Sequence, residues 1–169
     1  MDAIKEILNA RNEAIKKIDT IFDELIRKLE NNPPSSALPS SKAYEIIYPI
    51  ATNPTVFKGK SPTAVIFDNE RVDVRSWKMV IGEIMQRCNA DTEKHVDLMN
   101  LRGKISGPKR VLLAKDNDKM RSPIKVDENL YIETHYDTET NLRILMTRIL
   151  DAVSYDYSNI FVAIRVDTH

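Results

Sequence analysis

The chain has 169 residues but only one cysteine and four glycines, and these two shortages exclude several classes of protein. A single cysteine forms neither an intrachain disulfide framework nor a zinc site made of cysteines alone. The common nucleotide-binding fingerprints, G-x-G-x-x-G and G-x-x-x-x-G-K-[ST], are both missing. No apolar run approaches the ~20 residues that a membrane-spanning helix needs. The N-terminal residues carry a charge every few positions, unlike a secretory signal, so we expect a cytoplasmic protein.

Signals for catalysis are also sparse. His95, His135 and His169 are far apart in the sequence and show no metal-ligand spacing, so we predict no metal and no cofactor. Cys88 falls on the apolar face of a predicted helix, which is typical of a packing residue. No lysine has Asp or Glu two residues before it, as many restriction-type nucleases do, and the His-Asn-His and GIY-YIG signatures are missing. We therefore expect a binding protein rather than an enzyme, with a nucleotide hydrolase as the enzymatic alternative.

The first 31 residues are predicted to form one helix with a heptad seam, because apolar residues recur at alternating spacings of four and three. The seam consists of Ile4, Leu8, Arg11, Ile15, Ile18, Phe22, Leu25 and Leu29. Residues 1–31 are thus interpreted as a coiled-coil oligomerisation helix that self-associates through residues 4–29. The alternative is that the stripe packs on the chain's own core, since broad apolar stripes do both. The mixture of Ile, Leu and Phe leaves the number of helices in the oligomer open.

Residues 32–43 are predicted to be a linker, because Pro33 and Pro34 end the helix and a Ser/Pro composition favours an extended chain. Residues 44–169 are predicted to form a compact α+β binding domain with an antiparallel or mixed sheet and about three helices. We expect an edge strand at 44–50, hairpins at 64–74 and 124–134, and strands at 110–114 and 159–165. Helix N-caps are expected at Ser76, at Asp91, and at Asp137 or Thr138.

Charge is balanced overall, with 25 basic and 25 acidic residues, but it is distributed unevenly along the chain. Residues 102–125 have a net charge of +6, and residues 126–169 have a net charge of −5. A basic segment punctuated by Gly, Ser and Pro favours binding to phosphate groups, for which Arg and Lys are suited. The candidate phosphate-binding and nucleic-acid-binding residues are Lys104, Lys109, Arg110, Lys115, Lys119 and Arg121. The alternative is that the basic segment pairs with the acidic one and is neutralised internally.

The basic segment contains no aromatic residue, which argues against a stacking platform for single strands. The composition of this segment favours contact with a nucleic-acid backbone or capture of a small phosphorylated ligand. An alternative small-ligand site consists of Glu133, His135 and Arg143, where a strand ends before a helix. The structural interpretation of the same stretch is a helix cap at Asp137 with His135 hydrogen-bonded locally.

Residues from about 58 to 165 resemble a bacterial family of uncharacterised accessory proteins and C-terminal modules. The stretches that carry the resemblance are FKGKSPTAVIF, ERVDVRSWKMVIGEIMQRCN, MRSPIKVDENL and NLYIETHYDTETNLRILMTRILDAVSYDYSNIFVAIR. Its marks are Ser76-Trp77 at the start of a helix, Tyr131–Thr134 at the end of a strand, and the final strand. That family is similar to one found on mobile elements and beside restriction or defence genes. The resemblance implies a recognition or adaptor module and supplies no catalytic residues.

Together these patterns predict a non-enzymatic, homo-oligomeric module that binds phosphate-bearing ligands, most readily nucleic acid, in a mobile-element or phage-defence context. One alternative is a protein-interaction adaptor or inhibitor of a defence enzyme. The other alternative is a protein that sequesters a small nucleotide signal.

Overall fold

The computed structural model describes residues 2–31, 43–107 and 110–167. The chain divides into two units, Met1–Ser41 and Lys42–His169, which are described separately below. The predicted linker, Lys109 and His169 lie outside the described residues, apart from Ala43, which belongs to the first strand and not to a linker. None of the described helices is both long and apolar enough to cross a membrane.

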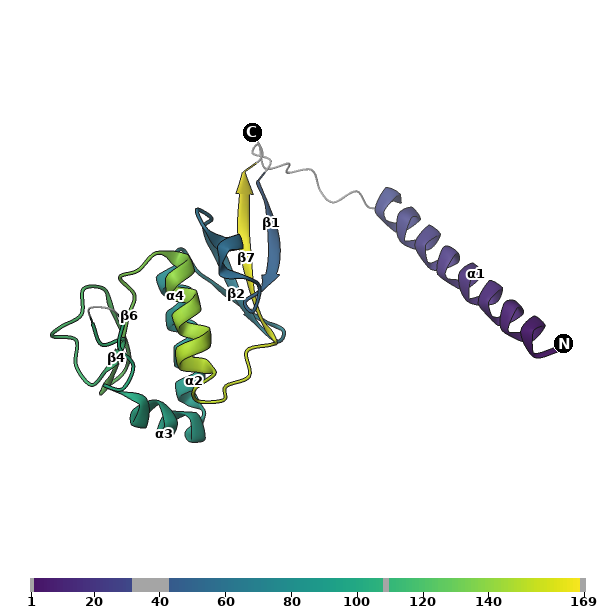
Figure 1. The fold of residues 1–169 in the computed structure, drawn as a ribbon. Helices are drawn as coiled ribbons and strands as arrows, with labels where there is room; N and C mark the ends of the chain where they lie inside the picture. Colours follow the sequence, from purple (N-terminus) through teal and green to yellow (C-terminus); the bar gives the residue numbers. More distant parts are fainter. Residues whose placement is uncertain (1, 32–42, 108–109, 168–169) are drawn as a thin grey trace. The chain divides into compact units, whose positions relative to one another are not determined.

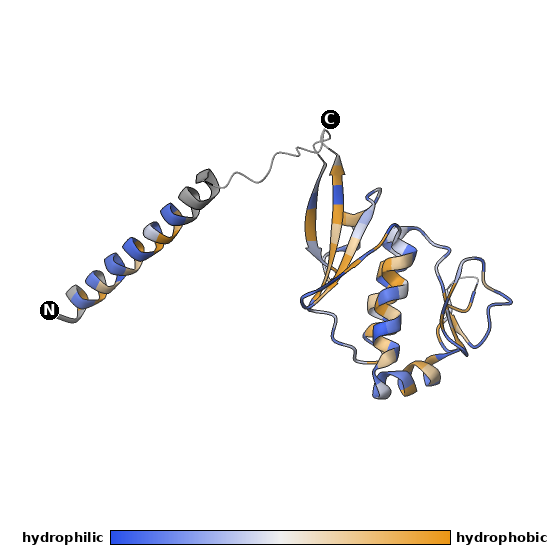
Figure 2. Cartoon of the chain, turned by 180° about the vertical axis from the view of Figure 1, so that it is seen from behind, coloured by the Kyte–Doolittle hydropathy of each residue, from blue (hydrophilic) through white to orange (hydrophobic). Residues whose placement is uncertain are grey.

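The first unit contains one helix, α1 (Asp2–Asn31), as the sequence predicts. Its apolar residues lie along one side and its charged residues along the other (Figure 2). Six large apolar side chains on α1 are 44 to 68% exposed. They are Ile4, Ile7, Ile15, Ile18, Ile21 and Phe22.

The second unit is an α+β domain whose described residues form two antiparallel sheets (Figure 1). The larger sheet has the order β1-β7-β2-β3, from β1 (Ala43–Pro49), β2 (Pro62–Phe67), β3 (Glu70–Asp73) and β7 (Ile160–Asp167). The smaller sheet has the order β4-β6-β5, from β4 (Leu113–Ala114), β5 (Pro123–Asp127) and β6 (Leu130–Glu133). Sequence analysis predicts one sheet, whereas the strands separate into two because helices pack between them.

Those helices are α2 (Trp77–Ala90) and α4 (Thr138–Ile144), and α4 continues as a π-helical segment, η2 (Leu145–Leu150). Figure 1 shows them between the two sheets, and α2 contacts both β2 and β5. A shorter helix, α3 (Thr92–Leu101), follows α2, and a 3₁₀ turn, η1 (Pro54–Phe57), contacts α4.

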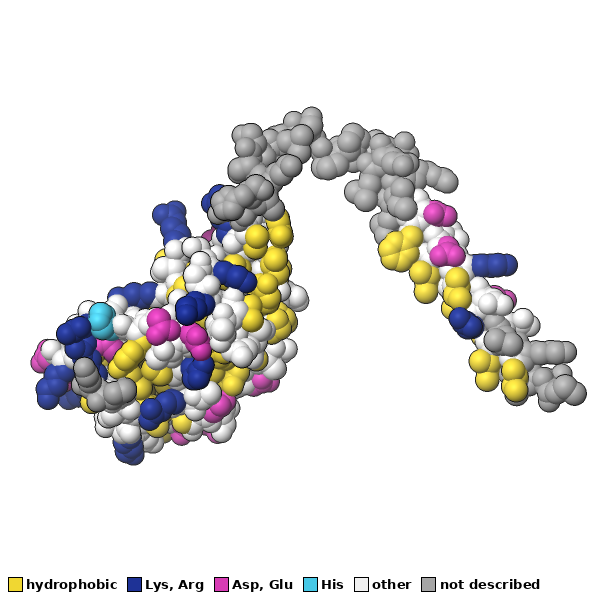
Figure 3. Space-filling view, turned by 45° about the horizontal axis from the view of Figure 1, so that its top comes forward, with side chains coloured by type: hydrophobic (Ala, Val, Ile, Leu, Met, Phe, Trp, Pro, Cys, Tyr) yellow, Lys and Arg dark blue, Asp and Glu magenta, His cyan; other side chains and the backbone are white. Residues whose placement is uncertain are grey.

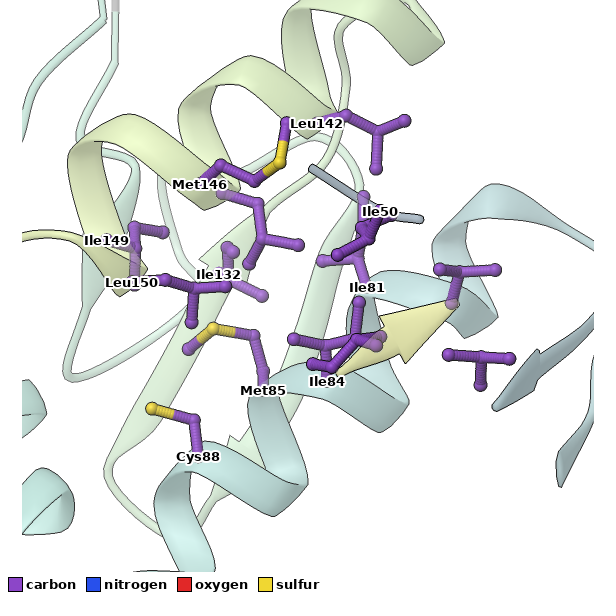
Figure 4. Packing of buried hydrophobic residues seen from close by; sticks show 14 of the residues in the cluster. Ile50, Ile81, Ile84, Met85, Cys88, Ile132, Leu142, Met146, Ile149 and Leu150 are labelled. Carbon is purple, nitrogen blue, oxygen red and sulfur yellow. The ribbon is translucent and has the colours of Figure 1, made fainter. Parts of the chain in front are cut away.

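The core forms where the apolar faces of the central helices meet. Ile81, Met85 and Cys88 of α2 lie opposite Leu142, Met146 and Ile149 of α4 and η2 (Figure 4). All of these residues except Met146 are at most 1% exposed. Burying one large aliphatic side chain stabilises the fold by about 1.5–3 kcal/mol. This packing fixes the loops and strand ends that carry the charged residues.

The predicted caps are confirmed. Ser76, Asp91 and Asp137 each accept a hydrogen bond from a backbone N–H in the first turn of α2, α3 and α4. The predicted edge strand at 44–50 and both predicted hairpins are also present. The predicted strand at 110–114 is shorter than expected, because only residues 113–114 pair with β6 and Val111 forms an isolated bridge with Ser106.

Candidate nucleic-acid interface

The basic segment, residues 102–125, includes β4 and the start of β5, and most of its described charged side chains are exposed. Lys104, Lys115, Lys119 and Arg121 are exposed, and Arg110 is half-buried. Lys109 lies outside the described residues. Figure 3 shows Lys and Arg side chains spread over one face of the domain, including the end that carries β4 and β6, with acidic side chains among them.

Within the described part of the chain, a single ion pair joins the basic segment to the acidic one. It links Arg110 Nη1 to Glu133 Oε2 at 3.9 Å. Among the same residues, Lys104, Lys115, Lys119 and Arg121 form no ion pair with an acidic side chain. The acidic segment therefore leaves most of the basic charge facing solvent.

Glu133, at the end of β6, has a buried carboxylate that is fully engaged by the backbone. Its two oxygens accept hydrogen bonds from the N–H groups of Arg121 (2.7 Å), Ser122 (2.9 Å), Thr134 (3.0 Å) and His135 (3.1 Å). Burial alone would raise the pKa of this carboxyl, but the four donors outweigh it and hold the pKa below its usual value. The carboxylate thus fastens the chain entering β5 to the chain leaving β6.

Arg110 has a buried guanidinium nitrogen with an incomplete set of partners. Its Nη1 atom has no hydrogen-bond partner among the described residues, although Glu133 lies within ion-pair distance. A buried guanidinium donor without an acceptor is costly. The nearby Glu133 carboxylate offsets the buried charge of Arg110.

Two basic side chains, Lys78 and Arg121, each make a polar contact at the start of β5. Lys78 Nζ lies 3.1 Å from the hydroxyl oxygen of Ser122, and the Ser122 hydroxyl lies 3.2 Å from that of Thr134. Next to it, Arg121 Nη1 lies 3.3 Å from His135 Nε2. A guanidinium only donates, so in this contact His135 Nε2 is the acceptor. The Thr134 hydroxyl donates to the Ser122 carbonyl at 2.6 Å, so Lys78 and Arg121 are the groups here that suit a phosphate.

Lys78 was not a candidate in the sequence analysis. The cap at Ser76 does place Lys78 in the first turn of α2, which is a usable signal. Its proximity to Ser122 depends on α2 packing against β5, and no local pattern in the sequence predicts that contact.

The remaining candidates of the basic segment line two hollows. Lys115 and Lys119 line one of about 520 Å³, together with Arg102, Asp116 and Asp118. Lys104 lines another of about 340 Å³ between α3 and residues 152–154. The structure thus distributes the predicted residues over neighbouring surfaces rather than in one closed pocket.

Two of the alternative small-ligand residues, Glu133 and His135, are joined by a hydrogen bond from the His135 N–H to the Glu133 carboxylate. The Glu133 carboxylate is occupied by backbone donors, and the His135 ring contacts Arg121. Arg143 pairs with Glu139 on α4 and lines a separate hollow of about 800 Å³ with Lys58 and Arg148. The local interpretation of this stretch is the one that the structure contains, with Asp137 as the cap of α4.

In the described residues, no group of three or more His, Cys, Asp or Glu side chains is placed to hold a metal ion. Comparisons of the chain with protein-family models, with curated proteins and with solved structures find no match.

Proposed function

We propose that the second unit binds the phosphate backbone of nucleic acid and that α1 brings several copies of it together. The observation that carries the proposal is the exposure of the basic segment, whose charge the acidic segment leaves largely unpaired. Phosphate contacts would come from Lys104, Lys109, Arg110, Lys115, Lys119 and Arg121, with Lys78 as an addition. A role in a mobile-element or defence setting rests on the family resemblance alone.

Backbone contact fits better than base stacking. The basic segment offers long cationic side chains and hydroxyl groups but no aromatic side chain. Binding of this kind depends strongly on salt, because each neutralised phosphate releases counterions. We expect little sequence preference, since phosphate contacts position a protein without reading bases.

The test is fluorescence anisotropy with a labelled DNA duplex and an RNA duplex between 50 and 200 mM salt. Affinity should fall steeply with salt, with a slope of about −0.9 in log K per log salt for each DNA phosphate contacted. Binding that is undetectable at 50 mM salt contradicts the proposal.

A triple variant, Lys115→Gln with Lys119→Gln and Arg121→Gln, should weaken binding to every sequence and reduce the slope by about two to three units. Arg148→Gln is the matched control, because it removes one exposed cation from the hollow beside α4. An unchanged slope in the triple variant would show that the ligand is held elsewhere.

The hollow of about 800 Å³ favours a second candidate, capture of a small phosphorylated nucleotide by Lys58, Arg143 and Arg148. Asp137 and Glu139 also line it, and Glu139 pairs with Arg143, so Lys58 and Arg148 would supply most of the attraction. Its volume lies within the range of small-molecule sites. Thermal shift with cyclic nucleotides and ADP-ribose derivatives tests it. A shift that Arg148→Gln removes and the triple variant keeps would favour this function over nucleic-acid binding.

A further inference from the structure

We propose that α1 pairs with α1 of a second copy of this chain in the antiparallel orientation, with Arg11 of each helix lying on Phe22 of the other. The inference rests on the proposed self-association through residues 4–29 and adds the direction and the register of the pairing. It starts from the apolar side of α1, where six large side chains are 44 to 68% exposed (Figure 3).

The charges of α1 favour a second protein helix over a lipid surface. Helices that lie on membranes are rich in Lys and Arg on their polar side. Residues 1–31 instead carry 6 basic and 7 acidic side chains, and both signs occur along the whole helix. An anionic bilayer would repel about as many of these charges as it attracts.

A parallel pair has a specific defect at Arg11. In a parallel coiled coil each seam residue meets its own copy, so two Arg11 guanidinium groups would lie side by side in an apolar seam. On the flanks a parallel pair would bring Ile7 beside Asn12 and Ala14 beside Asp19. Ile21 beside Ile26 would be the apolar flank pair, and it lies far from Arg11.

The antiparallel pair removes this defect over the full length of the seam. The seam is symmetric about the point between residues 16 and 17, so residues whose numbers add up to 33 lie opposite each other. This register places Ile15 opposite Ile18 and Arg11 opposite Phe22. An arginine over an aromatic ring is attracted to it, and the attraction is stronger where water is excluded.

The same register also sets the pairs beside the seam. On one flank Ala14 of one helix lies beside Ile21 of the other, and Ile7 lies beside Lys28. On the opposite flank Asn12 lies beside Asp19, where an amide donates to a carboxylate. A single polar seam residue is also a known device for fixing register, because any shifted pairing places Arg11 against an aliphatic residue.

Spin-label distances on the full-length protein test the orientation. The label goes on Glu6→Cys, since Glu6 is exposed and lies outside the seam. The antiparallel pair puts residue 6 level with residue 27 of its partner, so the two labels are separated by about 32 Å along the axis at ~1.5 Å per residue. Wild-type protein treated with the same label shows whether Cys88 contributes to the signal.

Mixed oligomers give an independent test. Wild type is mixed with Arg11→Glu, and the fraction of heterodimer is measured by native mass spectrometry. The antiparallel pair predicts no preference for the heterodimer, because residue 11 never meets its own copy. It also predicts that the Arg11→Glu homodimer is weakened by about fivefold or more through loss of the contact with Phe22.

A short distance between the two spin labels, which would place residue 6 of both helices at the same level, overturns the antiparallel pairing. A preferred heterodimer does the same, and both results leave self-association itself supported. A monomeric protein at all accessible concentrations overturns both, whether or not it binds lipid vesicles. Neither result bears on nucleic-acid binding, which the anisotropy experiment measures separately with short duplexes.

Discussion

Glu133 shows how one buried side chain can hold two separate segments of the chain together. It is 2% exposed and accepts four backbone hydrogen bonds from two separate segments. Replacing it by Gln puts an NH₂ group where two acceptor oxygens serve four donors. We expect Glu133→Gln to lower the free energy of unfolding by about 1–3 kcal/mol in urea denaturation. Glu128→Gln, on the exposed turn before β6, is the control and should be close to neutral.

The same residue predicts a pH dependence of stability. The pKa of Glu133 is lower in the folded state than its usual value, so the folded state binds its proton less readily. Its contribution is present at neutral pH and is lost as the pH falls below the ordinary Glu range, about 4.3, toward the folded pKa. Urea unfolding between pH 7 and pH 3 should show this decline in wild type and a flatter profile in Glu133→Gln. Parallel profiles would contradict the assignment.

The buried thiol of Cys88 should react slowly while the protein is folded. Burial in the core raises the pKa of its thiol to about 12, so almost no thiolate exists at pH 8. We expect a thiol reagent such as Ellman's reagent to react with the native protein at least tenfold more slowly than with the protein in 6 M guanidinium. A fast native reaction would show that α2 and η2 separate readily.

At the scale of elements, the isolated bridge between Ser106 and Val111 lies within the basic segment. Gly107 donates to the Arg110 carbonyl at 2.7 Å, and an added Cβ at Gly107 would lie 2.7 Å from the Tyr136 hydroxyl oxygen. We expect Gly107→Ala to displace Gly107 from Tyr136 and to lower the free energy of unfolding by about 1–3 kcal/mol, as overpacking does.

The double variant Gly107→Ala with Tyr136→Phe provides the check, because it removes the atom that the new methyl group would meet. Thermal unfolding and duplex affinity should both recover part of what Gly107→Ala loses. Equal losses in the single and the double variant would mean that Gly107 does not pack against Tyr136.

Elements with strong local signals were predictable. Ser76, Asp91 and Asp137 are side chains that cap helices, and each does so in the structure. The division into two sheets was not predictable, because it arises from the packing of α2 between β2 and β5. The contact of Lys78 with Ser122 has the same origin, so the sequence identified the exposed basic residues but not this neighbour.

At the scale of the whole molecule, self-association should multiply weak binding. Ile18 lies at the centre of the exposed apolar side of α1, and Ile18→Asp would place a charge in the seam. We expect this full-length variant to be monomeric and to bind a long duplex about 10²-fold more weakly, while its affinity for a short single-site duplex is unchanged. Sedimentation velocity and anisotropy with the two duplexes measure this, and an equal loss on both would contradict the role of avidity.

The pairing of β1 with β7 makes this domain suitable for circular permutation. Ala43, the first residue of β1, is the register partner of Asp167, the last residue of β7. The domain therefore begins and ends at one point of the sheet, and a short loop can join the two ends. A circular permutant opened at the exposed turn between β2 and β3 would keep the strand order, and it would let an effector be attached at the far end of the sheet.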